Sequence, residues 1–194
     1  MTPSKYMKTR CTWPAEDILM IEYHDHEWGV PLHDDRKHFE FLILDAFQAG
    51  LSWKTILHRR TGFRNAFSNF DVSKVAKFTD KHIEQLMQDT GIIRNRLKIA
   101  GTVKNARAFL LVQKEFGSFD KYIWQFVNGK TIQGKRNGGD IPATSVESDA
   151  MSKDLKKRGF TFVGSTICYA YMQAAGMVND HVKECFRHKE VKTL

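Results

Sequence analysis

Long apolar runs are missing from this sequence. A membrane-spanning helix needs roughly 20 consecutive apolar residues, and no stretch approaches that length; the one within residues 39–44 contains Glu40 and stops at Asp45. Residues 1–10 are polar and basic and lack the apolar centre of a secretory signal. We therefore expect a soluble protein that remains inside the cell.

Proline, glycine and cysteine are scarce. Four prolines and 13 glycines among 194 residues are too few for a fibrous or linker-dominated protein. The three cysteines cannot all pair, and a reducing compartment argues against disulfides. They are Cys11, Cys168 and Cys185. Cys168 lies in an apolar stretch and is expected to fill the core, whereas the other two remain candidates for metal binding.

Acidic residues are outnumbered by basic ones. Lysine and arginine total 30 against 22 aspartates and glutamates, so the formal net charge is 30 − 22 = +8. Such a balance suits a polyanionic partner, either nucleic acid or an anionic membrane surface. The basic residues are scattered over several predicted helices, which argues against a membrane-surface protein.

Sustained strand alternation is also absent, and helical spacing recurs instead. Apolar residues in 35–49 fall on one face at steps of three and four. Thr79 is a plausible N-cap for a later helix, and a polar-faced helix over 148–158 should stop at Gly159. Residues 164–177 are apolar nearly all round and predict a buried helix. We expect an all-α protein of about eight or more helices, in which residues 130–140 form a surface loop.

Residues 83–109 predict a short helical hairpin with one glycine, Gly91, in its turn. Six basic residues and no acidic one lie between residues 90 and 114. Backbone N–H groups at the start of the second helix, together with Arg94, would suit a phosphate. An ordinary hairpin with a solvated charged face would show the same pattern.

Histidine and cysteine residues near both ends of the chain could form a metal site. His181 and Cys185 are four residues apart, so a helix would place both on one face. Cys11 and His24 would complete a Cys2His2 set, which is typical of a structural zinc site. Buried thiols and hydrogen-bonded histidines would explain the same residues without a metal.

Residues 48–53 are predicted to join two helices. Gly50 would end the first helix, and Ser52 could cap the next one. Leu51 and Trp53 would then be held at a helix junction, where they could protrude.

Asp45 stands in an apolar stretch just before this junction. A carboxylate there should be paired, hydrogen-bonded or functional. An aromatic and acidic set also occupies residues 23–31. The alternative is that the aromatic residues belong to the core and that Asp45 is a partly exposed interruption.

At these residues the sequence resembles the bacterial 3-methyladenine DNA glycosylase I family. The match runs in unbroken order over almost the whole chain, from Cys11 to Cys185. Its motifs are CTW at 11–13, YHDHEWGVP at 23–31, QAGLSW at 48–53, GIIR at 91–94, KKRGF at 156–160, FVGSTICY at 162–169 and VNDH at 178–181. So many motifs in one order are highly specific.

The resemblance implies a helix-hairpin-helix superfamily fold with a structural zinc that joins the N- and C-terminal segments. One α-helical glycosylase domain would span 11–187, between an N-terminal tail at 1–10 and a C-terminal tail at 188–194. The implied zinc ligands are Cys11, His24, His181 and Cys185.

The same resemblance assigns a base pocket. Trp53 would be a stacking surface, Tyr23 a hydrogen-bonding wall, and Trp13 would close the pocket near the zinc. Asp45 would be the catalytic carboxylate, where the family pattern has a glutamate. Met20 stands where the pattern often has a second pocket tyrosine.

The implied activity is hydrolysis of the N-glycosidic bond of 3-methyladenine in alkylated double-stranded DNA by base flipping. Leu51 would fill the gap left by the extruded base, and the hairpin at Gly91 and Arg94 would grip the DNA backbone. The protein would be a monomer in the bacterial cytoplasm. The alternative from another class is a non-enzymatic DNA-binding relative that keeps the fold and the zinc.

Overall fold

The computed structural model describes residues 8–134 and 141–194. The greater part of the expected N-terminal tail (1–7) and part of the expected surface loop (135–140) lie outside the described residues. Within the described chain, no helix is long and apolar enough to cross a membrane.

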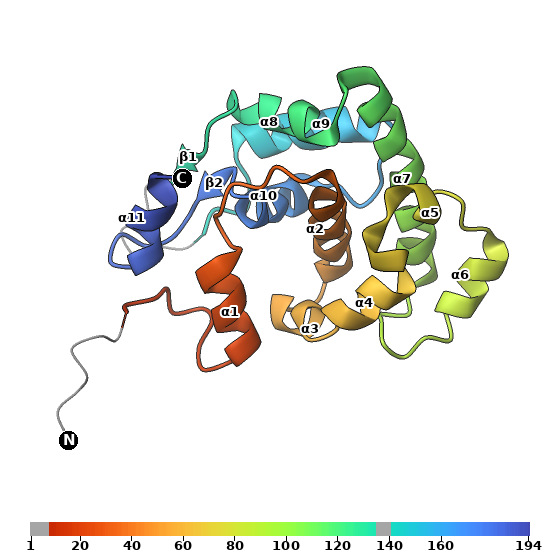
Figure 1. Cartoon of the computed structure of the whole chain (residues 1–194), viewed down its shortest axis with the longest axis horizontal. Coiled ribbons are helices and arrows are strands. Elements are labelled where there is room, and N and C mark those ends of the chain that lie inside the picture. Colours follow the sequence, from red (N-terminus) through yellow and green to blue (C-terminus); the bar gives the residue numbers. More distant parts are fainter. Residues whose placement is uncertain (1–7, 135–140) are drawn as a thin grey trace.

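The described residues form a mostly helical structure (Figure 1). Its α-helices are α1 (Ile18–His26), α2 (Asp35–Gln48), α3 (Trp53–Leu57), α4 (Arg60–Ala66), α5 (Val72–Val75), α6 (Asp80–Leu86), α7 (Arg96–Phe116), α8 (Phe119–Trp124), α9 (Val146–Lys157), α10 (Ser165–Ala174) and α11 (Phe186–Lys192). Two 3-10 turns are η1 (Ser68–Phe70) and η2 (Gln125–Val127).

Two short strands pair in parallel, β1 (Ile132–Gln133) and β2 (Val178–Asn179). The expected loop at 130–140 therefore contains a strand. A strand of two residues is too short to show an alternation of apolar and polar side chains. The backbone partners of β1 come from a segment far along the chain, so the pair forms only when the tertiary structure does.

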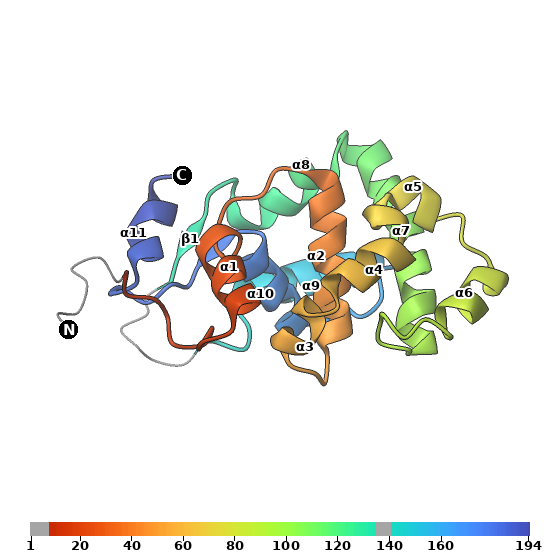
Figure 2. The same cartoon turned by 60° about the horizontal axis from the view of Figure 1, so that its bottom comes forward.

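Helix α2 lies in the middle of the molecule, as Figures 1 and 2 show. Asp34 begins the helix, because its side chain accepts the N–H of Lys37 at 2.8 Å. Residues 38–47 are all buried, since the helix packs against α3, α7, α8 and α10. The one-sided pattern expected for 35–49 therefore understates its burial.

Local signals placed several helix ends correctly. Thr79 caps α6 together with His82, and Gly159 follows α9 at a φ of +90°.

Cys168, on α10, is 1% exposed and belongs to the core, as expected.

The two ends of the described chain meet at one end of the molecule, where α1 and α11 lie near each other (Figure 1). The N–H of Phe186 donates to the carbonyl of Thr9 at 2.9 Å. Residues 188–194, expected as a tail, include most of α11, and Val191 is only 2% exposed.

A tight turn joins α6 to α7 where the hairpin was predicted. Asn95 caps α7, and Asp89 accepts the N–H of Gly91 at 2.7 Å. The turn packs closely on α4, because a Cβ built on Gly62 would overlap the carbonyl oxygen of Gly91. Only glycine at position 62 permits this approach.

Candidate functional site: an aromatic pocket beside a Cys2His2 cluster

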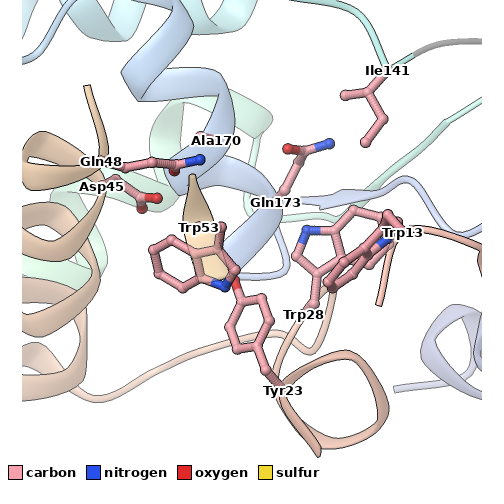
Figure 3. A pocket seen from close by; sticks show the side chains of 9 residues that line it. All are labelled: Trp13, Tyr23, Trp28, Asp45, Gln48, Trp53, Ile141, Ala170 and Gln173. Carbon is pink, nitrogen blue, oxygen red and sulfur yellow. The ribbon is translucent and has the colours of Figure 1, made fainter. Parts of the chain in front are cut away.

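A pocket of about 130 Å³ opens between helices α1, α2, α3 and α10 (Figure 3). All four residues that were expected to form a base pocket line it. The complete lining is Trp13, Tyr23, Trp28, Asp45, Gln48, Trp53, Ile141, Ala170 and Gln173. Segments from both halves of the chain therefore build one site.

The α2–α3 junction places Trp53 in this pocket. Gly50 has a φ of +83° after the end of α2, and Ser52 caps α3 by accepting the N–H of Thr55 at 3.1 Å. Both features were predicted from the sequence. The ring centroids of Trp53 and Tyr23 lie 5.0 Å apart at an interplanar angle of 47°. Two aromatic surfaces thus meet at an angle inside the pocket.

Trp13 and Trp28 form another wall. Their ring centroids are 5.0 Å apart in an edge-to-face arrangement of 74°. Trp28 and Gln48 both stand in the motifs quoted above, but the sequence assigns neither of them a role. Gln48 lies one helical turn after Asp45 on α2, which is the signal that could have placed it in the pocket. Gln173 comes from α10, and no local signal marks it.

Asp45 is a buried carboxylate in this pocket. It is 2% exposed, and its Oδ2 atom has no hydrogen-bond partner. Burial raises the pKa of Asp45 well above its usual value. Burial, with Asp45 nearby, also raises the pKa of the Tyr23 hydroxyl.

Two N–H donors in the pocket are unpartnered as well. They are the indole nitrogens of Trp13 and Trp53. Among the described side chains, four buried polar atoms lack a partner, and three of them line this pocket. Buried polar groups in folded proteins are normally hydrogen-bonded. The three unpartnered atoms of the pocket are therefore suited to hydrogen bonds with a polar, planar ligand.

Beside the pocket lies the predicted Cys2His2 cluster. Cys11, His24, His181 and Cys185 are all buried, and their ligand atoms lie within 4.8 Å of one another. The Sγ atom of Cys185 is 3.5 Å from His24 Nε2 and 3.5 Å from His181 Nδ1. Cys11 Sγ is 3.7 Å from His181 Nδ1.

These separations suit a tetrahedral metal site. Metal–sulfur bonds of about 2.3 Å and metal–nitrogen bonds of about 2.0–2.1 Å give sulfur–nitrogen edges of about 3.6 Å. The thiol of Cys185 has its pKa lowered to about 2, chiefly by hydrogen bonding with Cys11 and then with the two histidines. A thiolate is the form that binds a metal. The four residues could therefore hold a metal ion.

Outer partners orient both imidazoles. His24 Nδ1 lies 2.7 Å from Asp25 Oδ1, and Arg10 donates to Asp25 through two nitrogens. His181 Nε2 lies 3.0 Å from the carbonyl oxygen of Trp28. Contacts of this kind direct the other ring nitrogen toward a metal. Trp28 thus belongs to the pocket and also supports the cluster.

The three residues expected to contact DNA lie outside the pocket lining. Leu51 protrudes from the α2–α3 junction and is 41% exposed. Arg94 is exposed and Gly91 half-buried in the turn before α7. Met20, on α1, is buried and lines an open groove beside the pocket.

Comparison with known proteins identifies relatives over nearly the full chain. The model of the methyladenine glycosylase family matches residues 13–188. DNA-3-methyladenine glycosylase 1 of Escherichia coli is 49% identical over 177 residues, covering 91% of this chain and 95% of the relative. DNA-3-methyladenine glycosylase of Haemophilus influenzae is 47% identical over 180 residues, covering 92% and 97%.

Solved structures agree with this match. A crystal structure of 3-methyladenine DNA glycosylase I superposes with a TM-score of 0.89 at 48% identity, covering 92% of this chain and 98% of the other. A single-residue variant of 3-methyladenine DNA glycosylase I in complex with 3-methyladenine superposes with a TM-score of 0.89 at 35% identity, covering 91% of this chain and 96% of the other.

Proposed function

The chain belongs to the methyladenine glycosylase family, and we propose on this basis that it excises 3-methyladenine from alkylated DNA. The enzyme hydrolyses the N-glycosidic bond of the damaged nucleotide. The observation that carries the proposal is the aromatic pocket in which one carboxylate oxygen and two indole N–H groups have no partner.

The chemistry of the lesion suits such a pocket. Methylation at N3 makes the purine cationic, so the base leaves as a neutral molecule without prior protonation. A strong general acid is unnecessary, and the enzyme has mainly to extract the base from the stack and hold it.

Trp53 and Asp45 provide the attraction for a cationic base. An indole face attracts a cation by about 0.5–2 kcal/mol. Asp45 accepts a hydrogen bond from the exocyclic amine, and its negative charge favours the cationic lesion over normal adenine. A cation in the pocket also favours the ionised carboxylate, which burial disfavours in the free protein. Tyr23 forms a wall of the pocket, and Trp13 closes it.

DNA binding is assigned to the residues outside the pocket. The turn between α6 and α7 is of the helix-hairpin-helix kind, and Gly91 and Arg94 contact the backbone of double-stranded DNA. Leu51 fills the gap that the extruded base leaves. The net charge of +8 supplies affinity that does not depend on sequence.

We assign a structural zinc to the Cys2His2 cluster. Cys11, His24, His181 and Cys185 supply four protein ligands, so no position is left for a water molecule. The ion ties the N-terminal segment before α1 to the segment before α11 and thereby supports the Trp13–Trp28 wall.

We assign a monomer, with which a site built from residues of a single chain is consistent. The relatives compared above are bacterial, which supports a cytoplasmic enzyme that acts on the chromosome.

The test is base release from methylated duplex DNA, with the freed bases separated by chromatography. We expect the protein to release 3-methyladenine and free 3-methyladenine to inhibit it. Asp45→Asn serves as the pocket control. A parent protein that binds the duplex but releases no base would contradict the proposed activity and would be a non-enzymatic DNA-binding relative.

A further inference from the structure

Lys98 is a buried lysine that the assigned site does not use. It lies in the first turn of α7 and is 8% exposed. Burial lowers the pKa of its ammonium group. A buried ammonium without partners is costly, so its contacts show which part of the fold it supports.

The ammonium of Lys98 contacts the end of α2. Its Nζ donates to the carbonyl oxygen of Phe47 at 2.9 Å and to that of Ala49 at 2.8 Å. The carbonyl between them, of Gln48, accepts the N–H of Leu51 at 2.6 Å. Three successive carbonyls at the end of α2 are thus paired, two of them by a side chain from another helix.

The charge as well as the hydrogen bonds suits this position. The C-terminal carbonyls of a helix carry partial negative charge, and α2 has no basic residue in its own last turn. Lys98 supplies that positive charge from α7. Because the end of α2 leads directly into residues 49–52, the contact also restrains the backbone that carries Leu51.

Lys98 itself is held next to the turn that precedes α7. Asn95 accepts the N–H of Lys98 at 3.1 Å and thereby caps α7. Arg59, next to α4, donates to the carbonyl oxygen of Thr90 at 3.0 Å. Figures 1 and 2 show α2, α4 and α7 next to one another. One lysine therefore joins the turn assigned to the DNA backbone with the junction that holds Leu51.

We propose that Lys98 is a positioning residue for base extrusion, which holds Leu51 at a set place relative to the turn before α7. The inference rests on the proposed function. Lys98 does not line the base pocket, so it acts on the insertion of Leu51 into DNA rather than on contact with the base.

Lys98→Met tests this, because methionine keeps much of the aliphatic stem and removes the ammonium. Lys153→Met is the matched control, since Lys153 is an exposed lysine on α9. Each protein is measured for affinity to a duplex with a tetrahydrofuran abasic site, affinity to the same duplex undamaged, and affinity for free 3-methyladenine. Base release is followed under single-turnover conditions.

We expect Lys98→Met to reduce the preference for the abasic duplex, and the rate of base release, by about tenfold or more, as for a lost charged hydrogen bond. Affinity for free 3-methyladenine should stay within about twofold. In a Leu51→Ala background the same substitution should change the abasic preference by less than about threefold, because the residue being positioned is gone.

An unchanged abasic preference in Lys98→Met, or an equal loss whether or not Leu51→Ala is also present, would overturn the proposal. Equal loss of free-base affinity would overturn it too, since Lys98 would then support the pocket. Should Lys98→Met fail to fold, Lys98→Gln, which keeps an N–H donor, carries the same comparison. The duplex-binding measurements remain decisive even if the parent releases no base, which is the result that refutes the proposed function alone.

Discussion

Replacing Asp45 with asparagine should stabilise the free protein while it impairs the enzyme. Asp45 is buried, its Oδ2 atom lacks a partner, and burial raises its pKa. A carboxyl group with a folded pKa above its unfolded value of 3.8 lowers the stability of the fold as pH rises above 3.8. The loss levels off once the pH exceeds the folded pKa. Asp45→Asn removes this pH-dependent loss.

The size of the gain can be bounded. Each unit of difference between the folded and the unfolded pKa changes the free energy of unfolding by at most about 1.4 kcal/mol. At pH 7 the loss attributable to Asp45 therefore cannot exceed about 4 kcal/mol, because the group would protonate instead. An asparagine amide in the same place leaves polar atoms unpaired at a cost of about 1–3 kcal/mol. We expect Asp45→Asn to be the more stable protein at pH 7 by at most about 3 kcal/mol, and each kcal/mol gained raises the Tm of a chain this size by about 2–4 °C.

Thermal melting of parent and variant between pH 4.5 and pH 7.5 measures the effect. The difference in Tm should be largest at neutral pH and should shrink as the pH approaches 4. Glu16→Gln, which removes an exposed carboxylate, is measured beside it as the control. In the same proteins, base release by Asp45→Asn should fall by about 10- to 150-fold, whereas Asp45→Glu should retain activity. Equal or lower stability of Asp45→Asn at pH 7.5, or undiminished base release, would refute the role given to Asp45.

Further predictions concern the metal, the DNA contact and the packing of the turn. Elemental analysis of chelator-washed protein should find one zinc per chain, and His181→Ala should lower the Tm, because metal binding is coupled to folding; protein without stoichiometric metal or with unchanged melting would contradict the assignment. Arg94→Glu should weaken binding to damaged and undamaged duplexes alike and flatten the salt dependence by about one unit, whereas a loss confined to damaged DNA would place Arg94 in the pocket. Gly62→Ala should destabilise the fold by about 1–3 kcal/mol in denaturant unfolding, since its Cβ would overlap the carbonyl oxygen of Gly91; unchanged unfolding would show that the turn can move away from α4.

Helix ends and short motifs were readable from the sequence because they depend on neighbouring residues. A cap such as Ser52 or Thr79 acts within three residues, and a left-handed position such as Gly50 or Gly159 is a property of one residue. The apolar residues around Asp45 left open whether it is a paired or functional carboxylate or a partly exposed interruption, and the structure shows that it is buried. These features place the pocket tryptophan Trp53 at a helix junction before any fold is known.

The family resemblance assigned four residues to one metal site, a choice that their spacing alone left open. Spacing offered Cys11 and His24 as partners for His181 and Cys185 but could not exclude ordinary buried side chains. The structure brings the four ligand atoms within 4.8 Å of one another. The two pairs lie near opposite ends of the chain, and only packing of those ends together decides such a contact.

Tertiary structure alone decided the remaining features of the site. Periodicity reports one apolar face, so it could not show that α2 is surrounded and buried over residues 38–47. It could not pair β1 with β2 or bring Gln173 into the pocket. Nor could it show that Lys98 reaches the end of α2, because the charge of a lysine predicts a solvated surface. The chain determines its helices through local hydrogen bonds and spacing, whereas side chains far apart in sequence meet only when those helices pack.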